Sequence, residues 1–161
     1  MKYVESLEEK VQLVESSFSH LIGKELSGYE IAKVEIEGKW SYWHDLPIFL
    51  SFDNDLLAIS WTQLNELAIS SHRVLPFNVA GFTLAWAEEG FEPLDKIFGT
   101  TIISVSLGKG EFSLEGNDIE IWTRLFIGLN NGKTLEIFNA LDENGYCLHE
   151  NEVCGERNVF T

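Results

Sequence analysis

The sequence is poor in positive charge, in proline and in methionine, and each shortage argues against a class of structure or function. Only 11 of its 161 residues are lysine or arginine, against 26 aspartates and glutamates, so the formal net charge at pH 7 is −15. An acidic surface of this kind repels nucleic acid and anionic lipid headgroups, and we expect direct binding to neither. With only three prolines and one methionine, the chain has too few of these residues to form a proline-rich linker or a methionine-rich adaptable surface.

Long apolar runs are missing as well. No window approaches the roughly 18 to 20 apolar residues of a membrane-spanning helix. Acidic residues interrupt the N-terminal segment from Glu5 onward, which is unlike a secretion signal. We therefore expect a cytoplasmic protein without membrane contact. Cys147 and Cys154 are then expected to be reduced thiols, although their spacing alone leaves a disulfide open.

The short motifs that identify enzymes are absent. There is no GxGxxG, Walker A, HExxH or GxSxG sequence. Cys147, His149 and Cys154 are ligand types that zinc accepts, but a structural zinc site needs four ligands, and a fourth would have to come from far along the chain. No histidine lies in a recognised nucleophile motif. We therefore predict no catalytic residue, no metal site and no cofactor, in a protein that is not an enzyme.

Hydrophobic and aromatic residues are plentiful, at 45% and 12% of the chain. This content is typical of a folded globule rather than of a disordered chain. A length of 161 residues suits a single domain, residues 1–161, that buries its own core without disulfides or metals.

The hydrophobic pattern predicts an α+β fold, mostly antiparallel sheet with an N-terminal helix and a second short helix. Apolar residues recur every three or four positions from Val4 to Leu21, and Ser6 with Glu9 has the spacing of a capping box. From Gly28 the apolar period falls to two, which indicates strands. We expect strands near residues 31–36, 46–52, 56–61, 81–86, 101–107, 111–114, 119–129 and 134–138, and a short helix at 92–98.

Two parts of the chain resemble each other faintly. Leu21-Ile22-Gly23 matches Ile97-Phe98-Gly99, and residues 49–52 before one predicted turn match 126–129 before another. The offset is 76 to 78 residues, so residues 18–61 and 94–139 form a possible internal pseudo-repeat. Duplication of a unit made of a helix and a β-meander explains this pattern, and chance alternation in a β-rich chain is the alternative.

Two kinds of residue are candidates for binding a partner. Trp40, Tyr42 and Trp43 are large aromatics of the type that anchors interfaces, although in an alternating strand Trp43 faces opposite to the other two and some of the three can belong to the core. Acidic residues gather around 88–95 and between 134 and 156, where helix capping and a solvated tail are the plain alternatives. The predicted partner-binding residues are Trp40, Tyr42, Trp43, Asp45, Glu88, Glu89, Glu92, Asp95, Asp142 and Glu143.

In size, acidity, cytosolic character and lack of a catalytic signature, the chain resembles bacterial immunity proteins, the antitoxins of contact-dependent inhibition and other polymorphic toxin systems. The resemblance is one of composition and not of motif. It implies a tight complex with a basic toxin domain, often a nuclease, whose phosphate-binding site the acidic side chains would occupy or flank. Two alternatives stay open: an enzyme or small-ligand-binding domain with a pocket on the β-sheet, and a mimic of nucleic-acid charge. The sequence leaves the partner's identity and the oligomeric state undecided.

Overall fold

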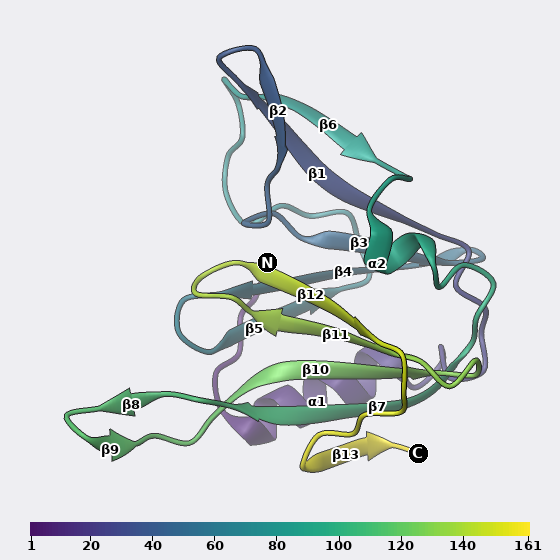
Figure 1. The fold of residues 1–161 in the computed structure, drawn as a ribbon, viewed down its shortest axis with the longest axis vertical. Helices are drawn as coiled ribbons and strands as arrows, with labels where there is room; N and C mark the ends of the chain where they lie inside the picture. The colour runs from purple at the N-terminus through teal and green to yellow at the C-terminus, as the bar shows by residue number, and fades with distance from the viewer.

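The computed structural model describes residues 1–161 and has the expected α+β fold, dominated by antiparallel sheets (Figure 1). The first sheet has the strand order β2-β1-β3-β4-β5, with β6 also paired to β1. Its strands are β1 (Gly28–Ile36), β2 (Lys39–Tyr42), β3 (Ile48–Phe52), β4 (Asp55–Thr62), β5 (Glu66–Ser70) and β6 (Thr83–Ala87).

The second sheet has the order β12-β11-β10-β7-β13. Its strands are β7 (Ile102–Gly110), β10 (Ile121–Leu129), β11 (Thr134–Asn139), β12 (Asn144–His149) and β13 (Arg157–Phe160), and the small hairpin of β8 (Ser113–Leu114) and β9 (Asn117–Asp118) lies between β7 and β10. One cluster of 25 buried apolar residues draws on both sheets and on the N-terminal helix. Burial of this shared apolar surface is the main stabilising contribution.

The helix α1 (Leu7–Phe18) begins at the predicted capping box. The Glu9 N–H donates to Ser6 Oγ at 3.2 Å, and the Ser6 N–H donates to Glu9 Oε2 at 3.3 Å, so two of the free amides at the helix start are paired. Its buried face includes Val14 and Phe18. The second helix, α2 (Glu92–Asp95), has Pro93 in its first turn as predicted but is shorter than the expected 92–98.

The structure has a strand at or near each of the predicted positions and adds five strands that the pattern did not predict: β2, β5, β9, β12 and β13. The interpretation of residues 134–156 as a solvated tail is wrong for β11 and β12, which pair with each other in the second sheet. Residues 150–156, here called the strap, then cross the outer face of that sheet to reach β13. The Val153 N–H donates to Thr134 Oγ1 at 3.0 Å and the Gly155 N–H to Ser106 Oγ at 2.8 Å, so the strap is bonded to β11 and β7 beneath it.

The two sheets have the same internal order. The sequence β6-β1-β3-β4-β5 in the first corresponds to β13-β7-β10-β11-β12 in the second. The registers correspond as well, since Tyr29 lies opposite Leu50 as Val105 lies opposite Ile127.

Backbone bonds between the halves follow the same correspondence. The Gly23 N–H donates to the Ile102 carbonyl at 2.8 Å, and the Gly99 N–H donates to the Leu26 carbonyl at 3.0 Å. The two halves therefore bond to each other reciprocally, through equivalent positions. Their origin by duplication stays a prediction.

Candidate functional site

Four rings from distant parts of the chain meet at one place on the molecule. The Tyr42 ring stacks on His44 with 5.8 Å between ring centroids and lies 5.0 Å from Phe91. Tyr146 contacts Phe91 edge-to-face at 5.2 Å and His44 at 5.4 Å. We call Tyr42, His44, Phe91 and Tyr146 the four-ring cluster. It joins β2 and the loop after it, the residue before α2, and β12.

Hydrogen bonds fix the same three segments to one another. The Asn144 N–H donates to the His44 carbonyl at 3.0 Å, and Tyr42 Oη donates to the Gly90 carbonyl at 3.4 Å. The buried Asn144 side chain accepts from the Trp61 N–H at 2.7 Å and donates to the Ile59 carbonyl at 3.0 Å, which ties β12 to β4 across the two sheets. The three groups of predicted binding residues, at 40–45, 88–95 and 142–143, are therefore neighbours in space.

His44 occupies the middle of the cluster with an unused ring nitrogen. Its Nδ1 is buried and has no hydrogen-bond partner. Burial lowers the pKa of His44, against the opposing effect of the nearby carboxylates of Glu143 and Asp45. The imidazole is therefore neutral at physiological pH and acts as a further aromatic ring beside these acids.

Part of the predicted acidic group is free to meet a partner. Glu88 and Glu89 are exposed, and neither they nor Glu143 form an ion pair within the chain. Asp45 is exposed and accepts a hydrogen bond from Trp43 Nε1 at 3.1 Å. Glu92 is paired with Lys96, with 2.9 Å between Oε1 and Nζ.

Two predicted binding residues hold the structure together instead. Asp95 accepts from Tyr29 Oη at 2.7 Å and from the Gly90 N–H at 3.0 Å. Asp142 accepts from Thr62 Oγ1 at 2.7 Å, and this bond, together with one from the backbone of Gln63, lowers the pKa of Asp142. Asp95 thereby fixes the turn before α2, next to Phe91, and Asp142 fixes the turn between β4 and β5.

The aromatic residues Trp40 and Trp43 belong to an extension formed by β2, the C-terminal half of β1, and β6, which projects at the top of the molecule (Figure 1). Trp40 is 46% exposed. Trp43 packs instead against Phe77 and Phe82, with centroids 5.6 and 4.8 Å away, and these two rings are themselves 43% and 53% exposed.

Several residues of this region were missed at the level of sequence: His44, Phe91 and Tyr146 in the four-ring cluster, and Phe77 and Phe82 beside Trp43. For Phe77 and Phe82, the local signal was the high apolar content of residues 74–82, before β6. The cluster itself depends on contacts between distant segments, which no local pattern marks.

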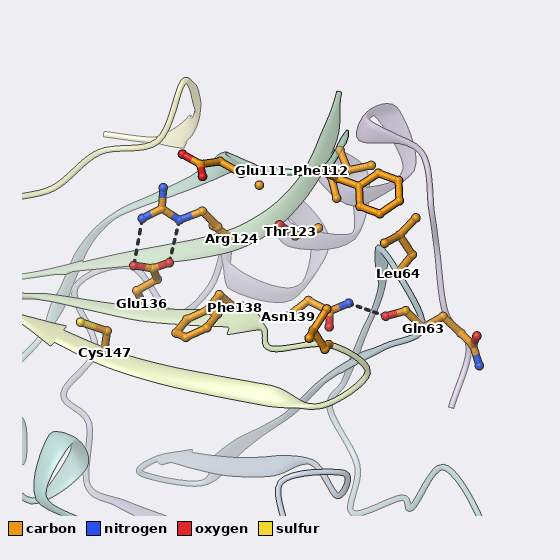
Figure 2. A pocket seen from close by; sticks show the side chains of 13 residues that line it. Gln63, Leu64, Glu111, Phe112, Thr123, Arg124, Glu136, Phe138, Asn139 and Cys147 are labelled. Atoms are coloured by element: carbon orange, nitrogen blue, oxygen red, sulfur yellow. Dashed lines mark hydrogen bonds and ion pairs between the residues drawn. The ribbon is translucent and has the colours of Figure 1, made fainter. Parts of the chain in front are cut away.

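A separate pocket of about 460 Å³ opens on the outer face of the second sheet (Figure 2). Within it, Arg124 Nε donates to Glu136 Oε2 at 2.8 Å and Arg124 Nη2 to Oε1 at 3.2 Å, while His149 Nε2 lies 2.8 Å from Oε1. Glu136 is only 4% exposed. Burial opposes its ionisation, but the bonds from Arg124 and His149 outweigh that effect and lower the pKa of Glu136.

The chemistry available in this pocket is limited by those bonds. Glu136 is an ionised carboxylate whose two oxygens are both engaged, so it is not free to serve as a base. Asn139 Nδ2 donates to the Gln63 carbonyl at 3.0 Å and holds the β4–β5 turn at the pocket mouth (Figure 2). Cys147 lines the same pocket, opposite Glu136 in the β11–β12 register.

The cysteines and histidines do not gather into a metal-binding group. The structure holds no cluster of three or more histidine, cysteine, aspartate or glutamate side chains suited to a metal ion. Cys147 and Cys154 are both free thiols, and Cys154 Sγ donates to Asn158 Oδ1 at 2.6 Å. None of the helices has the length and apolar character needed to cross a membrane.

No family model matches this chain, and no curated protein or solved structure matches it.

Proposed function

We propose that this protein is a non-enzymatic binding protein that captures a basic protein partner on one acidic, aromatic face. We call this face the recognition surface and define it as the four-ring cluster together with Trp40, Asp45, Glu88, Glu89 and Glu143. The observation that supports it is the convergence of three distant segments, each with aromatic or acidic side chains, on the four-ring cluster.

The composition of this surface suits a protein interface. Large aromatic side chains anchor interfaces because they bury wide, rigid areas, and Trp40 is 46% exposed. The hydroxyls of Tyr42 and Tyr146 are already bonded to the Gly90 carbonyl and to Asn144, so these two rings would contribute apolar contact. The unpaired carboxylates of Glu88, Glu89 and Glu143 offer charge-assisted hydrogen bonds to arginine or lysine. The net charge of −15 adds long-range attraction for a basic partner, which raises association rates at low salt.

The partner that fits best is a basic toxin domain, with this chain as its immunity protein. The acidic side chains would lie where the toxin holds phosphate groups, and the aromatic rings would supply the salt-resistant part of the affinity. This proposal rests on the recognition surface and on the resemblance in size and charge.

The test begins with capture of partners from the native lysate at low salt and at about 0.5 M NaCl, which screens contacts that are only electrostatic. We expect one basic protein to remain bound at the higher salt. That protein is then produced in pure form and titrated against the wild-type chain and two double variants. The double variant Glu88→Lys/Glu89→Lys reverses charge on the recognition surface, and Glu15→Lys/Glu152→Lys reverses the same charge at exposed positions on α1 and the strap.

The first double variant is expected to weaken binding about tenfold or more, and the second much less. Equal effects of the two would show that overall charge alone attracts the partner and would refute the assignment of the surface. If DNA displaces the partner, and the displacement depends only on the net charge of this chain, the result would favour the nucleic-acid mimic instead.

One observation favours a second candidate function, the binding of a small ligand in the pocket of Figure 2. The pocket combines the buried Glu136 and its partner Arg124 with the apolar wall of Phe138. If no protein is retained at either salt concentration, a thermal-shift screen of small metabolites against wild type and Glu136→Gln is the next experiment. A ligand whose stabilising effect disappears in Glu136→Gln would support this alternative.

A further inference from the structure

The outermost strand of the extension, β6, has an open edge. It pairs with β1 along one side, from Thr83 opposite Glu35 to Ala87 opposite Ile31. No strand covers its other side, and no backbone hydrogen bond outside the β1 ladder reaches residues 83–87. The far edge of the same sheet is closed differently: Val4 exchanges two backbone bonds with Leu67 of β5, at 2.8 and 2.9 Å.

The alternation of an antiparallel ladder identifies the backbone groups on the open edge. The Ala32 carbonyl accepts from the Trp43 N–H at 2.9 Å and therefore points away from β6. Residues of β1 on either side of Ala32 consequently bond toward β6, where their partners are Ala85 and Ala87. The N–H and C=O groups of Leu84 and Trp86 lie between these and point outward.

This edge also lacks the features that usually protect an exposed strand. Natural edge strands carry lysine, proline or a bulge that prevents pairing with another chain. The β6 sequence, Thr-Leu-Ala-Trp-Ala, has no charge and no proline, and its register with β1 is continuous over five residues. Phe82, which is 53% exposed, stands at the start of β6 with its ring against Trp43, and adds apolar surface at that end of the strand.

The charges around β6 select the occupant. Glu88 and Glu89 follow the strand directly, and Glu35 lies opposite its first residue. A second copy of this chain would bring the same carboxylates and a net charge of −15 to the contact, which opposes pairing of two β6 edges. Two positive charges also lie beside the strand: Lys33 is opposite Ala85, and Arg73, which is paired with Glu30, stacks on the Trp86 ring. With Glu30, Glu35, Glu88 and Glu89 against these two, the balance of charge around β6 is negative and favours an extended segment with alternating basic and apolar side chains.

We propose that a basic, extended segment of the partner adds to the first sheet as a strand alongside β6, bonding the backbone of Leu84 and Trp86. This inference rests on the proposed function and names its mode of recognition. Main-chain bonds then supply affinity without regard to side-chain identity, while the carboxylates of Glu88 and Glu89 and the Phe82 ring select a basic, partly apolar sequence.

The first test uses an acetylated and amidated eight-residue peptide of alternating lysine and valine, with amide hydrogen exchange of the labelled protein followed by NMR. In the free protein, the amides of Leu84 and Trp86 should exchange fast and that of Ala85 slowly. The peptide should slow exchange at Leu84 and Trp86 about tenfold or more and leave Ala85 unchanged. The same peptide with glutamate in place of lysine should have no effect. Absence of binding by the lysine peptide at millimolar concentration, or binding that leaves both amides fast, would overturn the inference.

The second test uses the captured partner and two variants at one position. Leu84→Pro removes the outward N–H without touching the bonds to β1, whereas Leu84→Ala shortens the side chain and keeps that N–H. We expect Leu84→Pro to bind the partner at least about tenfold more weakly than Leu84→Ala, with similar melting temperatures for the two. Equal binding would exclude strand addition while leaving the proposed function intact. The proposed function fails separately, if the Glu88→Lys/Glu89→Lys variant binds as well as its matched control.

Discussion

Lys10 is the one lysine that the fold buries completely, and its position has a local reason. Its ammonium donates to the Trp122 carbonyl at 2.7 Å and to Asn65 Oδ1 at 3.3 Å. The Trp122 carbonyl belongs to the stretch of β10 where the ladder with β7 shifts register, so the lysine supplies a donor at an irregular point of the sheet. Burial lowers the pKa of Lys10 to about 8.

This burial makes stability depend on pH in a predictable direction. The unfolded chain protonates Lys10 with a pKa near 10.5 and the native state with a pKa of about 8, so between these values the unfolded state binds more protons. The free energy of unfolding should therefore rise with pH across this window, by up to roughly 3 kcal/mol from this residue. The contribution is absent below pH 8, where Lys10 is charged in both states.

The variant Lys10→Met separates this effect from all other titrations. Urea unfolding of both proteins at pH 7.5 and pH 9.5 should show the wild type gaining stability relative to the variant at the higher pH. A difference between the two proteins that stays constant over this range would show that Lys10 titrates normally.

At the scale of elements, the strap depends on a glycine. A Cβ atom at Gly155 would collide with the backbone carbonyl of Leu107, because the strap lies directly on β7 there. We expect Gly155→Ala to lower the free energy of unfolding by about 1 to 3 kcal/mol and to speed amide exchange in β13, which the strap connects to the sheet. Gly28→Ala is the matched control, since its Cβ would meet nothing nearer than Ser51 Cβ at 4.0 Å.

Chemical denaturation gives the free energy of unfolding of both variants, and hydrogen exchange gives the amide exchange rates in β13. Gly28→Ala should change stability by less than about 1 kcal/mol, because it adds no collision and reduces the freedom of the unfolded chain. Equal losses in the two variants would mean that the strap has room to move away from β7.

The elements that sequence analysis predicted are those with strong local signals. The capping box started α1 where expected, and the turn between β3 and β4 lies at Asp53, whose φ of 57° is the left-handed conformation that aspartate tolerates. The strand β12 escaped prediction although it alternates, because Cys147 and His149 on its outer face and the acidic residues around it resemble a surface segment. The strand β13 has only four residues and depends on the strap to reach β7.

The recognition surface was predictable only in part, for a related reason. Tyr42 and Glu88 could be chosen from the sequence because one is aromatic and the other acidic. The cluster that brings their segments together depends on contacts with Phe91 and Tyr146, which the sequence did not indicate. Contacts between segments so far apart depend on the sheet topology, and no periodicity in one sequence encodes them.

On the scale of the whole molecule, the two halves are alike in topology but not independent in stability. The 25-residue core takes side chains from both halves, so either half alone would leave much of this surface in water. We expect a chain divided between Glu88 and Glu89 to reassemble when both fragments are co-expressed, and to give unfolded or aggregated material when either is made alone.

Co-purification through a tag on one fragment, followed by circular dichroism, decides this point. A fragment 1–88 that is monomeric, folded and cooperative in its unfolding would show that the shared core is dispensable. Reassembly would agree with the backbone bonds at Gly23 and Gly99, which join the halves at equivalent places.

The buried side chain of Asn144 also affects the entropic cost of binding a partner. It is 1% exposed and bonds the backbone of β4 on both its carbonyl and amide sides, while its own N–H bonds the His44 carbonyl. The segments of the recognition surface cannot slide past one another without breaking these buried bonds. A partner would therefore meet a preorganised face, lose little conformational entropy in ordering it, and gain affinity mainly as a long residence time in the complex.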